Sequence, residues 1–216
     1  MIVKSIVETI GNTPMVDVSR VFNLESRLLV KVESFNPGGS VKDRVAYNMI
    51  TTAIRQGKCD MDTEVIEPTS GNTGVGIAMV CAALNLSCTI VMPASMTLER
   101  RQLIQAYGAK LVLTPGETGM NGSIAKALEL AAQAKKAFVP MQFENPANPE
   151  IHEKTTALEI LKDTDNTVDI FVAGSGTGGT LSGVGKVLRA VNPQVEIIGV
   201  EPEGSPTISQ NKSGKH

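Results

Sequence analysis

The run Val168–Thr180, VDIFVAGSGTGGT, decides the fold class, because it joins an apolar strand-like segment to the start of a helix through a glycine-rich loop. Apolar runs alternate with segments of helical period along the rest of the chain. This alternation predicts an α/β fold, in which helices cover both faces of parallel sheets and the strands are doubly buried. We expect strands at Leu28–Glu33, Glu64–Glu67, Cys88–Met92, Lys110–Leu113, Phe138–Pro140, Val168–Ala173 and Glu196–Val200, and helices at Val41–Gly57, Gly74–Leu86, Leu98–Tyr107, Gly122–Ala137, Glu150–Lys162 and Thr180–Val191.

The loop Gly174–Thr180 has the composition of an anion-binding turn. Its successive backbone N–H groups can close on an anion, and the N-terminus of the following helix adds about half a positive charge. Thr177 and Thr180 can add hydroxyl donors. A tight turn without a ligand is the alternative, but four glycines in seven residues exceed what a turn requires.

The same loop also fits a second kind of site. Gly174, Gly176 and Gly179 match the dinucleotide-binding fingerprint, and Glu201 lies near the expected distance of about 20 residues for a ribose contact. Taken alone, the loop therefore leaves a nicotinamide or flavin site open.

Lys42 lies in the segment Asn36–Arg44, NPGGSVKDR, where it follows a glycine-proline turn and opens a helical pattern. Its amine can therefore face a cavity, and a desolvated lysine loses its proton easily and becomes a nucleophile toward carbonyls. A lysine together with a separate phosphate cradle is what a pyridoxal phosphate site needs. The alternative is a solvated lysine on a charged helix face, with Asp43 and Arg44 beside it.

The segment Pro68–Gly74 joins another strand to a helix and is rich in polar side chains. Thr69, Ser70 and Thr73 supply hydroxyls, and Asn72 supplies an amide. These groups suit a carboxylate better than a metal ion. An ordinary N-cap loop is the alternative, since Ser, Thr and Asn are common there.

Composition narrows the class of partner to small molecules. The 216 residues carry 20 basic and 22 acidic side chains, only 3% are aromatic and Trp is absent, so neither a basic stripe nor base stacking indicates nucleic acid. The only histidines, His152 and His216, are far apart, so we expect no metal site or triad, and we place His152 at the surface or in a cap.

The chain is expected to work in the cytoplasm. Its three cysteines, Cys59, Cys81 and Cys88, lack metal-ligand spacing and indicate a reducing compartment, with Cys81 and Cys88 read as small core hydrophobes. The N-terminus lacks a secretory signal. The apolar stretch Val75–Ala94 is expected to be a buried helix followed by a buried strand, not a membrane span.

Turn-forming residues mark the boundaries of elements. Asn145–Pro149 contains two prolines and is the expected linker between two domains. Gly108 is expected to end the helix from Leu98 with a left-handed cap. The polar tail from Glu203 to His216 is expected to form a loop.

Taken together, these segments resemble the fold-type II pyridoxal phosphate enzymes, and within them the cysteine synthases (O-acetylserine sulfhydrylases). The resemblance covers nearly the whole chain and depends on the shared order and spacing of runs that are each modest alone. The matching runs are Ile10–Pro14, Asn36–Arg44, Glu67–Gly74, Met92–Met96, Glu99–Arg101, Tyr107–Ala109, Leu113–Gly116, Gln142–Pro149 and Gly174–Thr180. The dinucleotide interpretation explains only one of them.

The resemblance implies a role for each matching position. Lys42 would form the Schiff base with pyridoxal 5'-phosphate and then act as acid and base at the substrate α-carbon. The residues that would hold the cofactor phosphate are Gly176, Thr177, Gly178, Gly179 and Thr180, and Asn72 would hydrogen-bond the ring hydroxyl. The residues that would grip the amino-acid carboxylate are Thr69, Ser70, Asn72, Thr73 and Gln142. The implied reaction is a β-replacement that converts O-acetyl-L-serine and sulfide to L-cysteine and acetate.

The resemblance also implies a two-lobed, three-layer αβα architecture like that of the tryptophan synthase β-subunit. Residues 1–12 and 35–145 would form the smaller lobe, and residues 13–34 and 146–216 would belong to the larger lobe. Members of this family are typically homodimers and continue well beyond the position of His216. The larger lobe is therefore expected to be incomplete, with 196–200 near a sheet edge, and a 216-residue product is expected to bind the cofactor poorly and turn over little.

Other activities share the same framework. Cystathionine β-synthases, cysteine desulfhydrases and phosphoserine-using relatives are alternatives, although the runs Met92–Met96 and Glu99–Arg101 favour an acetylserine enzyme. A different class is a non-catalytic module, because complete members can bind the C-terminal tail of serine acetyltransferase.

Overall fold

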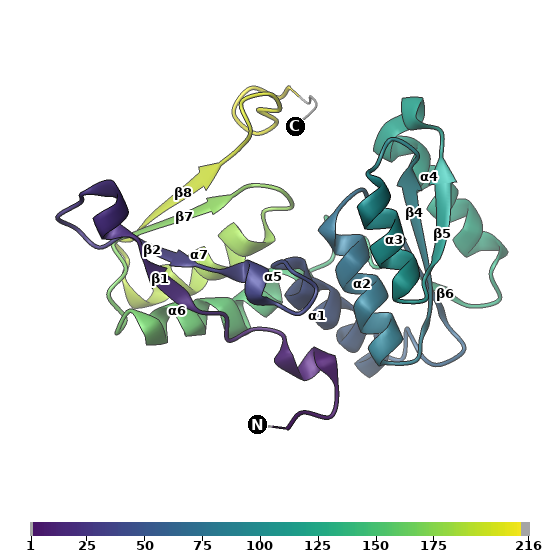
Figure 1. Ribbon diagram of the computed structural model, residues 1–216, viewed down its shortest axis with the longest axis horizontal. Coiled ribbons are helices and arrows are strands. Elements are labelled where there is room, and N and C mark those ends of the chain that lie inside the picture. Colours follow the sequence, from purple (N-terminus) through teal and green to yellow (C-terminus); the bar gives the residue numbers. More distant parts are fainter. Residues whose placement is uncertain (1, 213–216) are drawn as a thin grey trace. The chain divides into compact units, whose positions relative to one another are not determined.

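The computed structural model describes residues 2–212, and the chain divides into two compact units, Met1–Ala147 and Asn148–His216. The division falls within the proline-containing run 145–149. Each unit is described by itself (Figure 1). The assignment of residues 13–34 to the larger lobe stays a prediction, as does the assignment of 1–12 and 35–145 to the smaller lobe.

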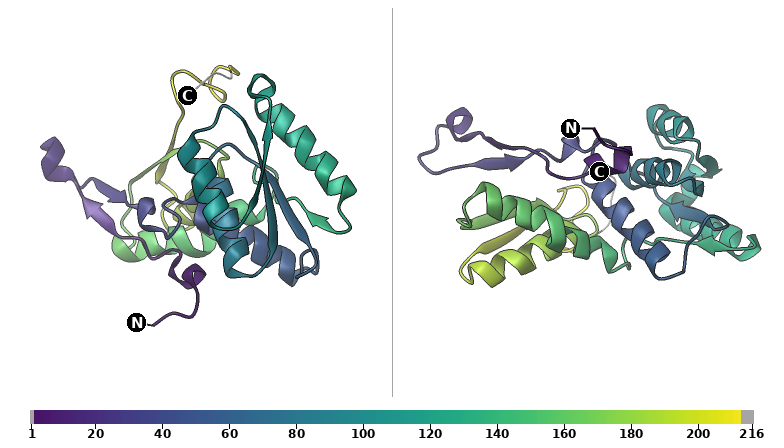
Figure 2. Two further views of the ribbon diagram at one scale, coloured as in Figure 1. Left: turned by 45° about the vertical axis from the view of Figure 1, so that its right-hand side comes forward. Right: turned by 90° about the horizontal axis from the view of Figure 1, so that it is seen from below.

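A four-stranded parallel sheet forms the centre of the first unit. Its strands are β3 (Glu64–Pro68), β4 (Ser87–Pro93), β5 (Lys110–Thr114) and β6 (Ala137–Phe138), in the order β5-β4-β3-β6. Right-handed crossovers place α2 (Asn72–Ala83) and α3 (Leu98–Ala106) on one face, while α4 (Gly119–Gln133) returns across the other (Figures 1 and 2). The expected three-layer αβα arrangement is confirmed.

The core of this unit lies on both sides of β3 and β4, whose central residues are fully buried. Ile66 and Val91 pack against Ala127 of α4, whereas Ile90 lies on the opposite face against α2. As expected, the apolar stretch 75–94 forms a buried helix and a buried strand, and no helix among residues 2–212 is long and apolar enough to cross a membrane. Gly108 has φ +82°, which confirms the left-handed cap after α3.

Helix α1 (Lys42–Arg55) packs against α2 through a glycine. A Cβ atom on Gly76 would lie 3.1 Å from the carbonyl oxygen of Lys42 and 3.2 Å from the Cβ of Ala46. The absence of a side chain at Gly76 therefore lets the first turn of α1 approach the second turn of α2.

The N-terminal part of the first unit differs from expectation. The expected strand at 28–33 is shorter, β2 (Leu29–Lys31), and it pairs in antiparallel fashion with β1 (Met15–Asp17), which was not predicted. Val30 is 45% exposed, so β2 is not a doubly buried parallel strand. Short helical turns lie before this ribbon, η1 (Ile6–Thr9), between its two strands, η2 (Ser19–Phe22), and after it, η3 (Glu33–Phe35). A further turn, η4 (Gly116–Thr118), comes before α4.

The second unit contains a two-stranded parallel sheet and helices packed on one face. After α5 (Ala147–Ile151), a π-helical turn η5 (His152–Thr156) leads into α6 (Ala157–Asp163), and the sheet pairs β7 (Ile170–Gly174) with β8 (Glu196–Val200). Helix α7 (Gly179–Val191) packs against β7 and β8. The tail is loop over 203–212, as expected, and residues 213–216, including His216, lie outside the described part.

One face of the β7–β8 sheet is exposed. The side chains on that face are Ile170, Val172, Ile198 and Val200, which are 41–56% exposed. The expectation of doubly buried strands is therefore wrong for this sheet, whereas the expectation that residues 196–200 lie at an edge is confirmed. Such uncovered apolar surface favours association.

Candidate active site

Lys42 is the first residue of α1, and a hydrogen-bonded turn fixes its position. The backbone N–H of Lys42 donates to Ser40 Oγ at 3.2 Å, and the N–H of Gly39, at φ +85°, donates to the Asn36 carbonyl at 2.8 Å. The side chain is partly buried, and desolvation lowers the pKa of Lys42 below the usual lysine value. The amine therefore gives up its proton more readily than an exposed lysine would.

Arg44 is buried next to this turn and forms an ion pair with Glu33, which is partly buried. Arg44 is 1% exposed, and its Nε and Nη2 donate to the two Glu33 oxygens at 2.8 and 2.7 Å. Thr13 Oγ1 and Asn36 Nδ2 donate to the same carboxylate at 2.6 and 2.9 Å. Burial raises the pKa of Glu33, but the hydrogen bonds from Arg44 and Thr13 outweigh it, so the net pKa lies below the usual value. Arg44 is thus part of the support of the turn and does not belong to a solvated helix face.

Asp43 is also buried, which the sequence interpretation missed. Its Oδ2 accepts the Gly38 N–H at 2.6 Å, while Oδ1 has no hydrogen-bond partner among the described residues. Desolvation raises the pKa of Asp43 to about 6. A Cβ atom on Gly38 would lie 2.5 Å from Oδ1, so glycine is needed there for the close approach. Gly38 in the sequence does not by itself identify Asp43 as the residue that approaches it.

The loop Thr69–Gly74 follows the carboxyl end of β3 and opens α2. Ligands of parallel α/β sheets bind at this end of the strands. Thr73 Oγ1 donates to Gln142 Oε1 at 2.6 Å, so the structure brings together two predicted carboxylate ligands that are 69 residues apart. Thr69 and Thr73 are buried, Ser70 is half-buried and Asn72 is exposed. Hydroxyl groups and the N-terminal N–H groups of a helix form a fitting set of donors for a carboxylate.

The predicted phosphate loop lies between β7 and α7 in the second unit. Gly178 has φ +77°, and among residues 2–212, apart from the adjacent residues of the chain, none lies within 4 Å of where a Cβ atom would stand on Gly174 or Gly176. Thr177 Oγ1 accepts hydrogen bonds from Asn148 Nδ2 at 2.9 Å and from the Gly179 N–H at 3.3 Å. Since the Thr177 oxygen accepts both, its own proton can be donated to an anion.

His152 is fully buried, so its expected place at the surface or in a cap is wrong. Its Nδ1 lies 2.9 Å from Thr156 Oγ1 and its Nε2 lies 3.3 Å from Thr180 Oγ1, which places the ring behind the start of α7. A Cβ atom on Gly183 would lie 2.8 Å from the Cβ of His152. The glycine at 183 therefore permits the contact that buries the histidine.

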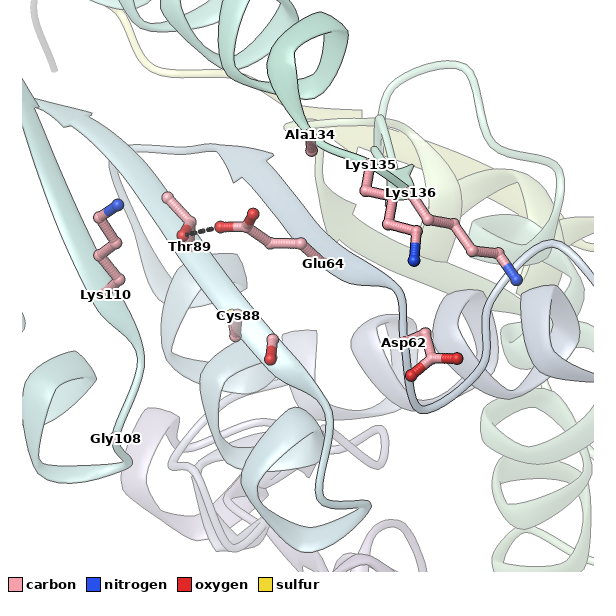
Figure 3. Close-up of a pocket in the computed structure, with 10 residues that line it drawn as sticks. Asp62, Glu64, Cys88, Thr89, Gly108, Lys110, Ala134, Lys135 and Lys136 are labelled. Carbon is pink, nitrogen blue, oxygen red and sulfur yellow. Dashed lines mark hydrogen bonds between the residues drawn. The ribbon is translucent and has the colours of Figure 1, made fainter.

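A cavity of about 510 Å³ lies elsewhere, at the amino ends of β3, β4 and β5 (Figure 3). Its lining includes Lys110, Lys136 and Cys88, and Thr89 Oγ1 donates to Glu64 Oε1 at 2.6 Å within it. It contains none of the predicted site residues. Because the loop 69–74 follows the opposite end of β3, this cavity is separate from the candidate active site.

Comparison with known proteins identifies the family. The profile of the family described as "Pyridoxal-phosphate dependent enzyme" matches residues 6–216. The chain belongs to this family. It is 51% identical to a cysteine synthase of Staphylococcus aureus over 99% of this chain and 69% of that protein. The description of this family names pyridoxal phosphate and not a dinucleotide.

Solved structures of this family share the fold. A hydrogen sulfide-producing enzyme from Fusobacterium nucleatum has a TM-score of 0.96 and 46% identity, with all of this chain and 71% of that one covered. A cysteine synthase (OASS) from Entamoeba histolytica has a TM-score of 0.95 and 41% identity, with all of this chain and 65% of that one covered. The predicted fold-type II architecture is thus confirmed, and the chain spans 65–71% of these two structures.

The donor set of this chain fits the family's cofactor. Lys42 provides a partly desolvated amine with a lowered pKa. The loop before α7 provides glycines with open space around them, a left-handed Gly178 and threonine hydroxyls at a helix N-terminus. The first group can bond to an aldehyde, and the second can hold a phosphate.

Proposed function

We propose that the chain is a cysteine synthase, which binds pyridoxal 5'-phosphate and replaces the acetate of O-acetyl-L-serine by sulfide to give L-cysteine. The packing of Lys42 against Gly76 carries the proposal, because it brings the lysine to the helix that begins with the loop 69–74. A nucleophilic amine and a carboxylate-binding loop thus belong to one compact unit. About 50% identity to cysteine synthases over nearly the whole chain supports the choice of reaction.

The loop 69–74 would fix the substrate by its carboxylate. Gln142 Oε1 accepts the Thr73 proton, so its Nε2 hydrogens are the donors that this side chain offers to an anion. Hydroxyls of Thr69 and Ser70 and the amide of Asn72 would complete the grip. A carboxylate held in this way orients the α-hydrogen toward Lys42 and lowers the entropic cost of proton transfer.

Lys42 would move the proton at the α-carbon. Its lowered pKa favours the neutral amine, which removes the α-hydrogen as acetate leaves and returns a proton to the same carbon after sulfide adds. Pyridoxal phosphate, when bound, supplies an aldehyde for condensation with amines and a ring that disperses the charge developing at the α-carbon.

The cofactor would be held by two sets of residues. Backbone N–H groups of Gly176, Gly178 and Gly179 and the hydroxyls of Thr177 and Thr180 would bind its phosphate, and Asn72 would hydrogen-bond its ring hydroxyl. Closure of the loop 69–74 over the substrate carboxylate would keep water from the reacting carbon.

Borohydride reduction followed by peptide mass spectrometry tests the cofactor site. The cofactor mass should appear on the peptide that contains Lys42 and should be absent from a Lys42→Ala variant. Labelling of another lysine, or no labelling at saturating pyridoxal phosphate, would contradict the proposal.

Product analysis tests the reaction. We expect cysteine and acetate from O-acetylserine and sulfide, and much slower turnover of phosphoserine or of serine with homocysteine. Cysteine alone is the most informative competing substrate, because a similar structure is that of a hydrogen sulfide-producing enzyme. Faster release of sulfide from cysteine than synthesis of cysteine would replace the proposed reaction by a β-elimination.

We also infer that the protein acts in the cytoplasm as a homodimer and that its carboxylate-binding loop can receive the C-terminal carboxylate of serine acetyltransferase. Free thiols at Cys59, Cys81 and Cys88 support a reducing compartment. Cross-linking with light scattering tests the dimer. A pull-down with the acetyltransferase tail peptide tests the second interaction, which Lys42→Ala should leave intact.

A further inference from the structure

We propose that Glu67 is a positioning residue for the substrate carboxylate, acting through the turn that carries Gln142. The inference rests on the proposed function of the loop 69–74, and it gives a role to a buried carboxyl group that the reaction itself does not use.

Glu67 lies near the carboxyl end of β3 and is 1% exposed. Its Oε2 accepts the N–H of Met141 at 3.0 Å, and its carboxylate also accepts the N–H of Gln142. Desolvation raises the pKa of Glu67 to about 7, and these two main-chain donors offset part of that rise. A buried carboxylate is costly to retain, and its named partners are main-chain N–H groups instead of a cation.

The turn that donates these hydrogen bonds has an unfavourable backbone conformation. Met141 has φ +52°, in the left-handed region that side chains other than Gly, Asn and Asp rarely adopt. The N–H groups of Glu144 and Asn145 both donate to the Met141 carbonyl at 3.0 Å, and Asn145 Nδ2 donates to the Pro140 carbonyl at 2.9 Å. The Glu67 carboxylate thus anchors the entry of a tight, strained turn.

The anchored turn sets the position of the Gln142 side chain. Gln142 is 8% exposed, and its Oε1 accepts the Thr73 proton at 2.6 Å, which fixes the orientation of the amide in the loop 69–74. A chain of hydrogen bonds therefore runs from Glu67 through the Gln142 backbone to Thr73. If the carboxylate is lost, Met141 and Gln142 can relax, and Gln142 Nε2 is no longer held where it can donate to a bound carboxylate.

The first test is amide hydrogen exchange on the full chain, which requires neither cofactor nor substrate. In Glu67→Gln, an amide replaces one acceptor oxygen, so the Met141 and Gln142 amides should exchange at least ~10-fold faster. The matched control is Glu64→Gln on the same strand, whose carboxylate accepts a hydrogen bond from Thr89 at 2.6 Å near the amino end. Unchanged exchange at 141 and 142 in Glu67→Gln, or equal acceleration in the control, would overturn the proposal.

The second test measures substrate binding in the cofactor-loaded protein by titrating its visible spectrum with O-acetylserine. Glu67→Gln should weaken binding ~10-fold, whereas kcat, where turnover is measured, should change less than twofold. In a Gln142→Ala background the same substitution should add less than twofold, because both changes act through one side chain. Equal binding by wild type and Glu67→Gln, or full additivity of the two changes, would refute the positioning role.

The two proposals fail in different ways. If the wild-type chain carries no cofactor on Lys42 and no amino acid alters its spectrum, the proposed function fails, while the exchange experiment still decides whether Glu67 holds the turn. If wild type binds O-acetylserine and Glu67→Gln binds it equally well, only the positioning role fails.

Discussion

Replacement of Gly179 by alanine should disrupt the predicted phosphate loop through one side chain, Asn148. A Cβ atom on Gly179 would lie 2.1 Å from Asn148 Oδ1, 2.6 Å from its Cγ and 2.9 Å from its Nδ2. All three distances are shorter than real Cβ contacts, so the Asn148 amide must move. Its movement breaks the 2.9 Å hydrogen bond from Asn148 Nδ2 to Thr177 Oγ1 and removes the partner that orients the Thr177 hydroxyl.

The cost has two parts. Forcing extra volume into a packed site costs about 1–3 kcal/mol, and loss of one neutral hydrogen bond costs about 0.5–1.5 kcal/mol. We therefore expect Gly179→Ala to lower the free energy of unfolding by about 2–4 kcal/mol. For a chain of this length the corresponding fall in melting temperature is about 5–15 °C.

Thermal and urea denaturation of the full chain measure this effect, with Gly176→Ala as the matched control. Gly176 lies in the same loop, but no described residue other than its chain neighbours is within 4 Å of its Cβ position, so its replacement should change the free energy of unfolding by less than about 1 kcal/mol. In Gly179→Ala the affinity for inorganic phosphate and for pyridoxal phosphate should also fall. Equal stability of the two variants would refute the argument that Asn148 is packed against Gly179.

Three further substitutions test the support of Lys42. Burial lowers the pKa of Lys42, so Lys42→Met should be more stable than wild type at pH 7. The difference in the free energy of unfolding between the two should narrow as the pH rises from the pKa of Lys42 in the folded state toward its unfolded value of about 10.4. In that window only the unfolded state binds the proton, which stabilises the folded wild type as the pH rises. The pKa of Asp43 is raised to about 6, so between about pH 4 and 6 the folded state holds a proton that the unfolded state has lost. The free energy of unfolding of the wild type should therefore fall as the pH rises from about 4 to 6, and urea titrations of Asp43→Asn should lack that fall. Arg44→Ala leaves the Glu33 carboxylate without its cation and should lower the free energy of unfolding by about 3–5 kcal/mol, whereas Arg55→Ala at the exposed end of α1 should cost less than about 1 kcal/mol.

The sequence predicts the first unit's sheet well because its strands are continuously apolar and its glycines end the helices. Strands β3, β4 and β5 begin and end within one residue of the expected positions. Where helix and strand share an alanine-rich segment, the boundary is wrong: α4 ends at Gln133, and Ala137, expected as its last residue, lies in β6. Alanine has a high helix propensity, but Ala137 is in a strand because it pairs with Glu64 of β3.

The ribbon β1–β2 and the sheet β7–β8 show that an apolar run predicts a strand but not its pairing partner or its burial. An apolar run such as Leu29–Lys31 is compatible with a buried parallel strand, and only the pairing partner reveals the antiparallel, half-exposed ribbon. Likewise, Val172 and Ile198 have the composition of buried residues, yet they lie on the face that α7 does not cover. An apolar composition indicates that a side chain favours burial, but whether it is buried depends on whether a further layer of structure covers that face of the sheet.

The sequence indicated those parts of the candidate site that lie within short local motifs. Lys42, the hydroxyl-rich loop 69–74 and the glycine loop before α7 each follow a strand or turn and open a helix, and their ligand roles stay predictions that the geometry supports. The buried groups beneath them, such as Asp43 and His152, could not be assigned in this way. Their burial arises from close backbone approaches at Gly38 and Gly183, and a glycine in a sequence does not say which residue takes the space it leaves.

The segment from Gln142 to Asn148, which contains Pro146, does more than connect the two units. As a linker it would need only to be irregular, yet Gln142 Oε1 accepts a hydrogen bond from Thr73 and Asn148 Nδ2 donates to Thr177. Each predicted anion-binding loop therefore takes a side-chain brace from the same short segment, one at each end of it. Gln142 is held in the first unit by the turn that Glu67 anchors, and Asn148 lies in α5 of the second unit. The residues on either side of the unit boundary therefore each supply a side-chain partner to one predicted anion-binding loop, so this region is more than a spacer.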